Sequence, residues 1–331
     1  MEEYKEQAAN EIDVMEDSIL KYDPSVLRLL LQDKTTKRNI IWATSDYEAL
    51  GTGYEEWSEI TPELITGENT LLIQPRSAKA IEEQSARTRD KAEVFTPSWV
   101  CNSQNNLIDT EWFGRENVFN RETYEGWVTT NEPVDFSGVD RDWTKYVDAQ
   151  RLEITCGEAP YLVSRYDTVT GVYIPTHNRI GLLDRKMRIV EENTEERDDW
   201  IVWSLRALQS VFGYEYQGDN LLLARENLLF SYIDYYREHF HDDPDVGLLR
   251  KVANIIAWNI WQMDGLKYVV PNSCHDVEAI QLNLFGTPEP PQPCPGCKQG
   301  DPFKHTGIYC VIQDWRTKEP VRFIDMMKGW K

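Results

Sequence analysis

The sequence predicts an α/β protein built on a doubly wound, mostly parallel sheet, and two features of residues 92–270 lead to this prediction. Short apolar segments typical of buried strands alternate with longer segments whose apolar residues recur at helical spacing. The first of these strands ends in a tight turn that contains a glycine. Such alternation is typical of parallel sheets that bind ligands at the carboxyl ends of their strands.

The central elements follow one another in a regular order. RLEITCG (151–157) predicts a strand ending in a turn, and WIVWSLRALQSV (200–211) predicts a helix with an apolar stripe. VFGYEYQ (211–217) is the second strand, and DNLLLARENLLFSYIDYYREHF (219–240) is a long helix. VANIIAWNIWQMDGL (252–266) then predicts a helix that continues into a short third strand.

Smaller regions flank these elements. SVLRLLL (25–31) predicts a helix, whereas NIIWAT (39–44) and NTLLIQP (69–75) predict short strands, which together make an N-terminal α/β or helical region. The tail from 286 to 310 is dense in Pro and Gly and predicts a loop that carries Cys and His. We therefore divide the chain into an N-terminal region, a central domain and a Cys/His-rich segment: residues 1–90, 91–285 and 286–331.

The charge of the chain limits its partners. Lys and Arg number 35 against 56 Asp and Glu, a net charge of -21, which repels nucleic-acid phosphates unless basic residues are concentrated locally. The N-terminus is acidic and polar, unlike a secretory signal. No apolar run approaches the roughly 18 residues that cross a membrane. We expect a cytoplasmic protein that does not bind DNA tightly on its own and does not bind membranes.

Four motifs occur in series between about residues 85 and 270. They are AEVFTPSWV (92–100), RLEITCGEAPYL (151–162), VFGYEYQGDNLLLARENLL (211–229) and NIWQMDGL (259–266). In this order they resemble the S-adenosylmethionine-binding half of the DNA adenine methyltransferases of restriction-modification systems. The resemblance implies a methyltransferase-like sheet over residues 91–285.

The resemblance also implies roles for carboxylates at the strand ends. Glu153 would face the methionine amino group, Glu215 would accept the ribose hydroxyls, and Asp264 would read the adenine amino group. Carboxylates suit a ligand with an ammonium group and a vicinal diol, because they accept charge-assisted hydrogen bonds. The resemblance places further cofactor-binding residues at the upstream turn and at the glycine turn: Phe95, Thr96, Pro97, Cys156 and Gly157.

The glycine turn departs from the family pattern. Ala159 stands where the family has a second glycine, and Glu158 adds a carboxylate beside the cofactor. Pro160 follows at a position typical of a first helical turn, so we expect a helix to begin there and to present free amide groups to the ligand.

The family's catalytic Asn-Pro-Pro-Tyr segment is not found after the last motif. The nearest string is a proline-rich loop or, alternatively, a divergent catalytic segment: Glu289, Pro290 and Pro291. We expect weak or no methyl transfer by the chain alone and a protein partner, from a restriction-modification or phage system, through which it meets DNA. The alternative is an inactive regulatory or decoy subunit whose acidic surface resembles DNA.

Soft metal ligands gather near the C-terminus. A Cys-x-x-Cys pair on a Pro-Gly turn can direct two thiolates to one tetrahedral ion, so a structural zinc is expected there. The alternative is a set of reduced cysteines, and the pair Cys274-His275 could replace one ligand. A catalytic zinc is not expected, because four protein ligands leave no open position. The predicted ligands are Cys294, Cys297, His305 and Cys310.

Overall fold

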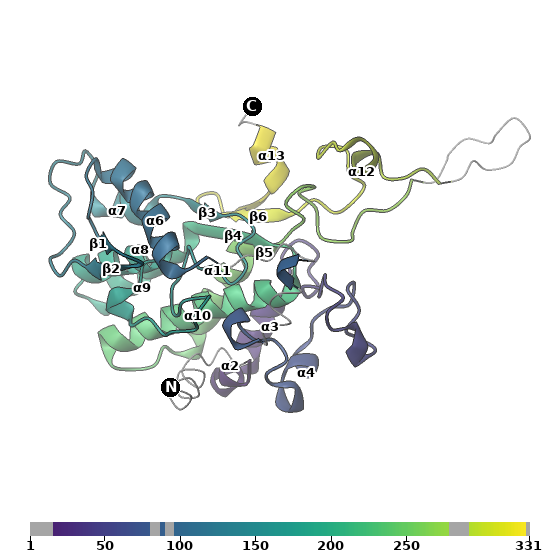
Figure 1. Ribbon diagram of the computed structural model, residues 1–331, viewed down its shortest axis with the longest axis horizontal. Helices are drawn as coiled ribbons and strands as arrows, with labels where there is room; N and C mark the ends of the chain where they lie inside the picture. The colour runs from purple at the N-terminus through teal and green to yellow at the C-terminus, as the bar shows by residue number, and fades with distance from the viewer. Residues whose placement is uncertain (1–15, 80–86, 90–95, 278–290, 329–331) are drawn as a thin grey trace, which may run out of the picture.

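The computed structural model of the protein describes residues 16–79, 87–89, 96–277 and 291–328. Its centre is a sheet of three parallel strands in the order β3-β4-β5 (Figure 1). The strands are β3 (Arg151–Glu153), β4 (Val211–Glu215) and β5 (Ile260–Gln262). The predicted α/β class with a parallel sheet is confirmed. The three central strands also lie where the sequence predicts them.

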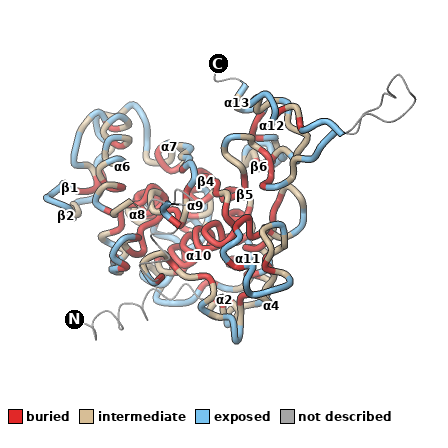
Figure 2. Tube along the Cα trace, turned by 45° about the vertical axis from the view of Figure 1, so that its right-hand side comes forward, coloured by how far each residue is buried: buried red, intermediate tan, exposed pale blue. Residues whose placement is uncertain are grey.

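Two long helices cover one face of this sheet. The helix α10 (Gly218–Phe240) follows β4, and α11 (Val246–Asn259) leads into β5. The side chain of Asp245 caps α11 by accepting a hydrogen bond from the amide of Leu248 at 2.9 Å. Nearly all of α10 is buried (Figure 2). Val211 of β4 and Ile260 of β5 belong to this first core.

The N-terminal region packs into the same core. Its helices are α2 (Glu16–Tyr22), α3 (Pro24–Leu31) and α4 (Pro62–Ile65), and α3 lies against α11. Asp23 caps α3 by accepting from the amide of Ser25, with Pro24 at the first helical position. The predicted helix is confirmed. Short 3-10 turns lie at Glu48–Leu50, Gly67–Asn69, Arg76–Ala78 and Thr176–Asn178.

The two N-terminal strands are wrong predictions. Residues 39–44 form only isolated bridges, because the side chain of Gln262 bonds both the amide and the carbonyl of Ile41, at 2.9 and 2.8 Å, in place of a neighbouring strand. Residues 70–73 form turns and bends, with Leu71 at a φ of 122° that interrupts extended backbone.

The helix expected at Pro160 is also absent. Residues 158–162 form turns, in which Ala159 has a left-handed φ of 63°. The chain returns to helix at α8 (Leu182–Asn193) and α9 (Arg197–Gln209), which lead to β4. Upstream of β3 lie α6 (Ser98–Phe113), the hairpin β1–β2 (Asn120–Thr123, Gly126–Thr129) and α7 (Trp143–Asp148).

The C-terminal segment covers part of the other face of the sheet. It consists of α12 (Pro295–Gln299), β6 (Val311–Asp314), β7 (Glu319–Arg322) and α13 (Phe323–Met327). Phe212, Tyr214 and Trp261 meet Phe323 there in a second, smaller core. Figure 1 shows β6 and α13 on the opposite side of the sheet from α10. None of the described helices has the length and apolar character that crossing a bilayer requires.

Candidate functional site

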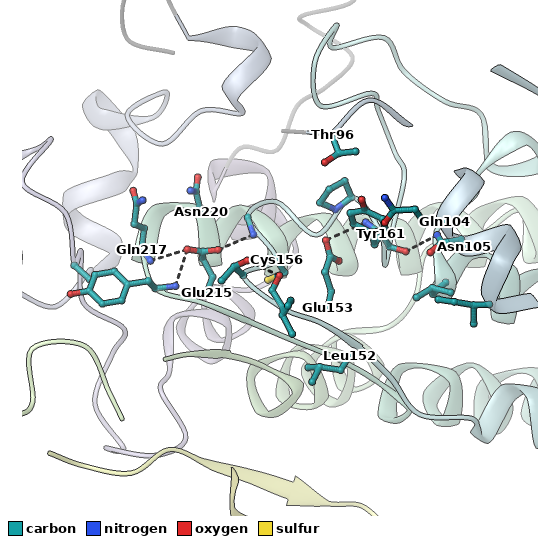
Figure 3. A pocket seen from close by; sticks show the side chains of 18 of the residues that line it. Thr96, Gln104, Asn105, Leu152, Glu153, Cys156, Tyr161, Glu215, Gln217 and Asn220 are labelled. Atoms are coloured by element: carbon teal, nitrogen blue, oxygen red, sulfur yellow. Dashed lines mark hydrogen bonds between the residues drawn. The ribbon is translucent and has the colours of Figure 1, made fainter. Parts of the chain in front are cut away.

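A cleft of about 960 Å³ opens at the carboxyl ends of β3 and β4 (Figure 3). We call it the strand-end cleft. The turn after β3, the end of β4, the helix α6 and part of the N-terminal region line it. Its lining includes five of the residues that the methyltransferase motifs predict: Thr96, Glu153, Cys156, Gly157 and Glu215.

Glu215 ties the ends of two strands together. One carboxylate oxygen accepts a hydrogen bond from the amide of Gly157 at 2.9 Å, and the other accepts from Tyr216 at 2.8 Å and from Gln217 at 3.2 Å. Burial raises the pKa of Glu215, although these amides favour its ionised form. Gly157 has a φ of 52°, the left-handed conformation that glycine adopts without strain.

Glu153 lies buried beside this turn. Its two oxygens accept hydrogen bonds from the amides of Tyr161 at 3.3 Å and Leu162 at 3.2 Å. These are the amides that a helix starting at Pro160 would have left free for a ligand, so Glu153 takes the place of that ligand. Burial raises the pKa of Glu153 to about 8, against the two amide hydrogen bonds and with a smaller contribution from Glu215.

Cys156 is a packing residue of the cleft. Its sulfur lies over Gly213, where an added Cβ would come within 3.2 Å of it. Burial, together with the nearby carboxylates of Glu153 and Glu215, raises the pKa of the Cys156 thiol well above its usual value. A buried neutral thiol is a poor nucleophile, so Cys156 shapes the cleft without reacting in it.

The helix α6 forms a wall that the sequence motifs did not identify. Figure 3 shows Gln104 and Asn105 at one end of the cleft and Thr96 above Tyr161. The side-chain Nδ2 of Asn105 donates to the backbone carbonyls of Tyr161 and Ile180, both at 3.1 Å, which fixes α6 against the turn. The polar run SQNN within a helix was the available signal, because buried amides need partners.

Two more of the predicted cofactor residues, Pro97 and Asp264, are not part of the cleft lining. Pro97 is the N-cap of α6, and Phe95 lies outside the described residues. Asp264 accepts hydrogen bonds from the amides of Leu266 at 3.0 Å and Lys267 at 3.2 Å, and its carboxylate pairs with the Lys267 ammonium at 3.0 Å. In this structure Asp264 therefore stabilises its own turn.

Only one residue of the nearest catalytic string lies within the described part of the chain. Glu289 and Pro290 lie outside the described residues. Pro291 is exposed and is not part of the lining. The catalytic assignment of this string stays a prediction.

A second candidate site lies at the C-terminal side. The thiols of Cys274, Cys294 and Cys297 and the imidazole of His305 gather with their ligand atoms within 4.8 Å of one another. We call this group the thiol–imidazole cluster, and it could hold a metal ion. Cys310, which the spacing predicts as a ligand, is not a member. Its buried thiol instead donates to the carbonyl of Gln262 at 3.3 Å, and Cys274 takes the fourth position.

The thiols of the cluster differ in their electrostatic surroundings. Burial disfavours ionisation of Cys294, but hydrogen bonds from Thr306, Cys297 and His305 lower its pKa to about 5. Burial and hydrogen bonds to the two other thiols raise the pKa of Cys274 to about 11.

Comparison with known proteins identifies no relative of this chain. No protein-family model matches the sequence, and no curated protein or solved structure is significantly similar to it. The resemblance to DNA adenine methyltransferases therefore depends on the four sequence motifs alone.

Proposed function

We propose that the chain is a DNA adenine methyltransferase-like protein of a restriction-modification or phage system, which binds S-adenosylmethionine in the strand-end cleft and needs a partner for methyl transfer. One observation carries the proposal. Glu153, Gly157 and Glu215, which come from two separate motifs, line one cleft at the ends of adjacent parallel strands. This is the usual ligand position in open α/β sheets.

The chemistry of the lining suits a cationic nucleoside. An ionised carboxylate offers about four lone-pair positions, and three amides donate to Glu215, so the carboxylate keeps acceptor capacity for a ribose hydroxyl. Glu153, with a pKa of about 8, would ionise when an ammonium group binds beside it. A cleft of about 960 Å³ is within the size range of small-molecule sites.

In this proposal the chain positions the cofactor and does not supply acid-base chemistry. Methyl transfer is a direct displacement at the sulfonium carbon, which depends mainly on the alignment of the two reactants. The residues that would orient the cofactor are Glu153 at the amino-acid end and Glu215 at the ribose end.

The outer edge of β3, beside the cleft, is suited to pairing with a strand of a partner chain. Among the described residues, β3 pairs with β4 alone. Leu152 in β3 and Ile154 directly after this strand also line the cleft, and they are 45% and 64% exposed. Exposed apolar residues on an unpaired edge strand are typical of a surface that another strand covers. We propose that a partner adds that strand and brings the missing catalytic segment.

Calorimetric titration of the full chain with S-adenosylmethionine tests the proposal. We expect micromolar binding, weakened at least tenfold by Glu153→Gln, because the amide cannot become the carboxylate that pairs with the ammonium group. Glu195→Gln, at an exposed position, is the matched control and should leave the affinity unchanged. Absence of binding by the folded chain would contradict the proposal.

The variant Asp264→Asn separates the motif-based role of this residue from its observed position. Loss of cofactor binding together with unchanged stability would assign Asp264 to the adenine. Unchanged binding would mean that Asp264 does not contact the adenine. The adenine would then lie against Tyr216 and Gln217, which line the cleft.

A further inference from the structure

We propose that the thiol–imidazole cluster binds one zinc ion, and that this ion clasps the C-terminal segment onto the second face of the sheet. The proposal is independent of the cofactor proposed for the strand-end cleft. It uses different residues, and it concerns how the second core is held in place.

The distances from the imidazole nitrogen to the three sulfurs match a tetrahedral zinc site. The Nδ1 atom of His305 lies 3.5 Å from the sulfur of Cys274 and 3.6 Å from the sulfurs of Cys294 and Cys297. With Zn–S bonds of about 2.3 Å and Zn–N bonds of about 2.05 Å, the N–S edge of a regular tetrahedron is about 3.6 Å. All three N–S separations therefore have the length that one shared ion would impose.

Two glycines give the ligands the space that this arrangement needs. An added Cβ on Gly296, inside the Cys-Pro-Gly-Cys turn, would lie 2.6 Å from the imidazole ring of His305. An added Cβ on Gly307 would lie 3.1 Å from the sulfur of Cys274. The backbone thus approaches closely at both segments that supply the ligands.

Hydrogen bonds made by residues next to the ligands hold these segments together. The amide of Thr306 donates to the sulfur of Cys294 at 3.3 Å, and its hydroxyl accepts from the amide of His275 at 3.0 Å and donates to the carbonyl of that residue at 2.6 Å. The amide of His305 donates to the Tyr309 hydroxyl at 2.9 Å. Supporting bonds of this kind are typical of structural metal sites.

The donor set selects the metal and its role. Three thiolates and one imidazole are the ligands of structural zinc sites, and harder cations such as Mg²⁺ and Ca²⁺ prefer oxygen. Four protein ligands close the coordination sphere, so the ion has no open position for a substrate. We therefore assign a structural role to the zinc.

Backbone hydrogen bonds next to the cluster link the proposed zinc site to the second core. The amide of Val270 donates to the carbonyl of Ile308 at 2.8 Å, and the amide of Cys310 donates to the carbonyl of Tyr268 at 3.1 Å. The chain then enters β6, and Ile312 packs beside Trp261 in the second core. A zinc ion that joins Cys274 to residues 294–305 therefore fixes the segment that covers this face.

The metal content of the purified full chain tests the proposal. We expect one zinc per chain by elemental analysis, lost in Cys274→Ser and retained in Cys310→Ser. The two variants form a matched pair, since the cluster contains the first residue and spacing alone predicts the second. Zinc retained in Cys274→Ser and lost in Cys310→Ser would overturn the ligand assignment.

A cobalt titration distinguishes loss of a metal ligand from loss of metal through misfolding. Co²⁺ added to the chelator-treated chain should give the visible absorption of a tetrahedral thiolate site. His305→Cys should retain that absorption with a shifted spectrum, because a fourth thiolate preserves the coordination, whereas His305→Ala should lose it. A wild-type chain that contains no zinc and gives no such absorption would overturn the proposal.

Discussion

The strand-end cleft and the thiol–imidazole cluster differ in how their polar groups are satisfied in the free chain. In the cleft, Glu153 and Glu215 accept five amide hydrogen bonds from the turn residues. In the cluster, three sulfurs and an imidazole nitrogen lie within 4.8 Å of one another, and the amide of Thr306 donates to the sulfur of Cys294 at 3.3 Å.

This difference separates two kinds of site. The carboxylates of the cleft also build the turn, so the cleft keeps its shape without a ligand and a ligand has to share these carboxylates. The cluster brings together four groups that suit a metal ion, so we expect its shape to depend on the proposed zinc ion. Loss of the ligand should therefore change the two regions very differently.

Metal removal should produce the largest effect. Apparent free energies of zinc binding reach about 10–16 kcal/mol in small zinc-dependent domains, so removal of the ion by a chelator should cost several kcal/mol of local stability. We expect amide hydrogen exchange in residues 294–310 to accelerate at least a hundredfold, because the clasp is lost. Exchange in residues 151–163 should stay within threefold. Equal acceleration of both regions would contradict the independence of the two sites.

The pH dependence of stability should be the next largest effect. Glu153 has a pKa of about 8 in the folded chain against an ordinary value of 4.5, so the folded state binds a proton that the unfolded state releases. The stability contributed by this proton is present below pH 4.5 and is lost as the pH rises through about 8, a change of at most about 5 kcal/mol.

The variant Glu153→Gln isolates this contribution, since the amide resembles the protonated acid and does not titrate. In urea denaturation between pH 5 and pH 8, the wild type should lose more stability than the variant. Parallel pH profiles would mean that Glu153 ionises normally in the folded chain. Below pH 8, the affinity for the cofactor should increase about tenfold for each unit by which the pH is raised, because binding of the ammonium group releases the proton of Glu153.

A substitution at Glu215 should have an intermediate effect. Glu215→Gln weakens the link between β4 and the turn, because the carboxylate accepts the amide of Gly157 at 2.9 Å. A hydrogen bond to a charged group contributes about 1.5–3 kcal/mol, so we expect a loss of about 2 kcal/mol in urea denaturation and faster exchange of the Gly157 amide. A change below about 0.5 kcal/mol would contradict the bridging role.

The sequence predicted the centre of the fold because its signals there are local. The three short strands and the helices α9, α10 and α11 are apparent from apolar spacing, whereas α8 was not predicted. The turn motifs place Glu153, Gly157 and Glu215 at strand ends. The prediction of a helix starting at Pro160 assumed that the first amides of this helix have no partner in the chain. The capture of those amides by Glu153 is a contact between residues eight and nine positions apart, which periodicity does not report.

The residues of the thiol–imidazole cluster, which we propose as metal ligands, show the same limit of sequence-based prediction. Spacing identified Cys294, Cys297 and His305, which lie within one short segment. The fourth ligand could not be chosen in this way, because Cys274 reaches the cluster through the pairing of Val270 with Ile308. Cys310 lies closer in sequence, but the next strand carries it into the second core. The wall formed by α6 was missed for a similar reason, since its amides act on a turn more than 50 residues away.

The smallest predicted effect concerns Ala159, where the turn lacks the glycine of the resembled family. Ala159 is buried in a left-handed conformation with a φ of 63°, which costs a non-glycine residue about 1–2 kcal/mol. Ala159→Gly relieves that strain but loses about 0.8 kcal/mol of methyl burial and about 0.5–1 kcal/mol of chain entropy. We expect a net change within about 0.5 kcal/mol of zero in urea denaturation.

Ala224→Gly, a buried control inside α10, has no strain to relieve and should cost about 1–2 kcal/mol. Equal losses at the two positions would show that the turn does not hold Ala159 in the left-handed conformation, and the cleft would then not have kept the backbone shape of a glycine turn.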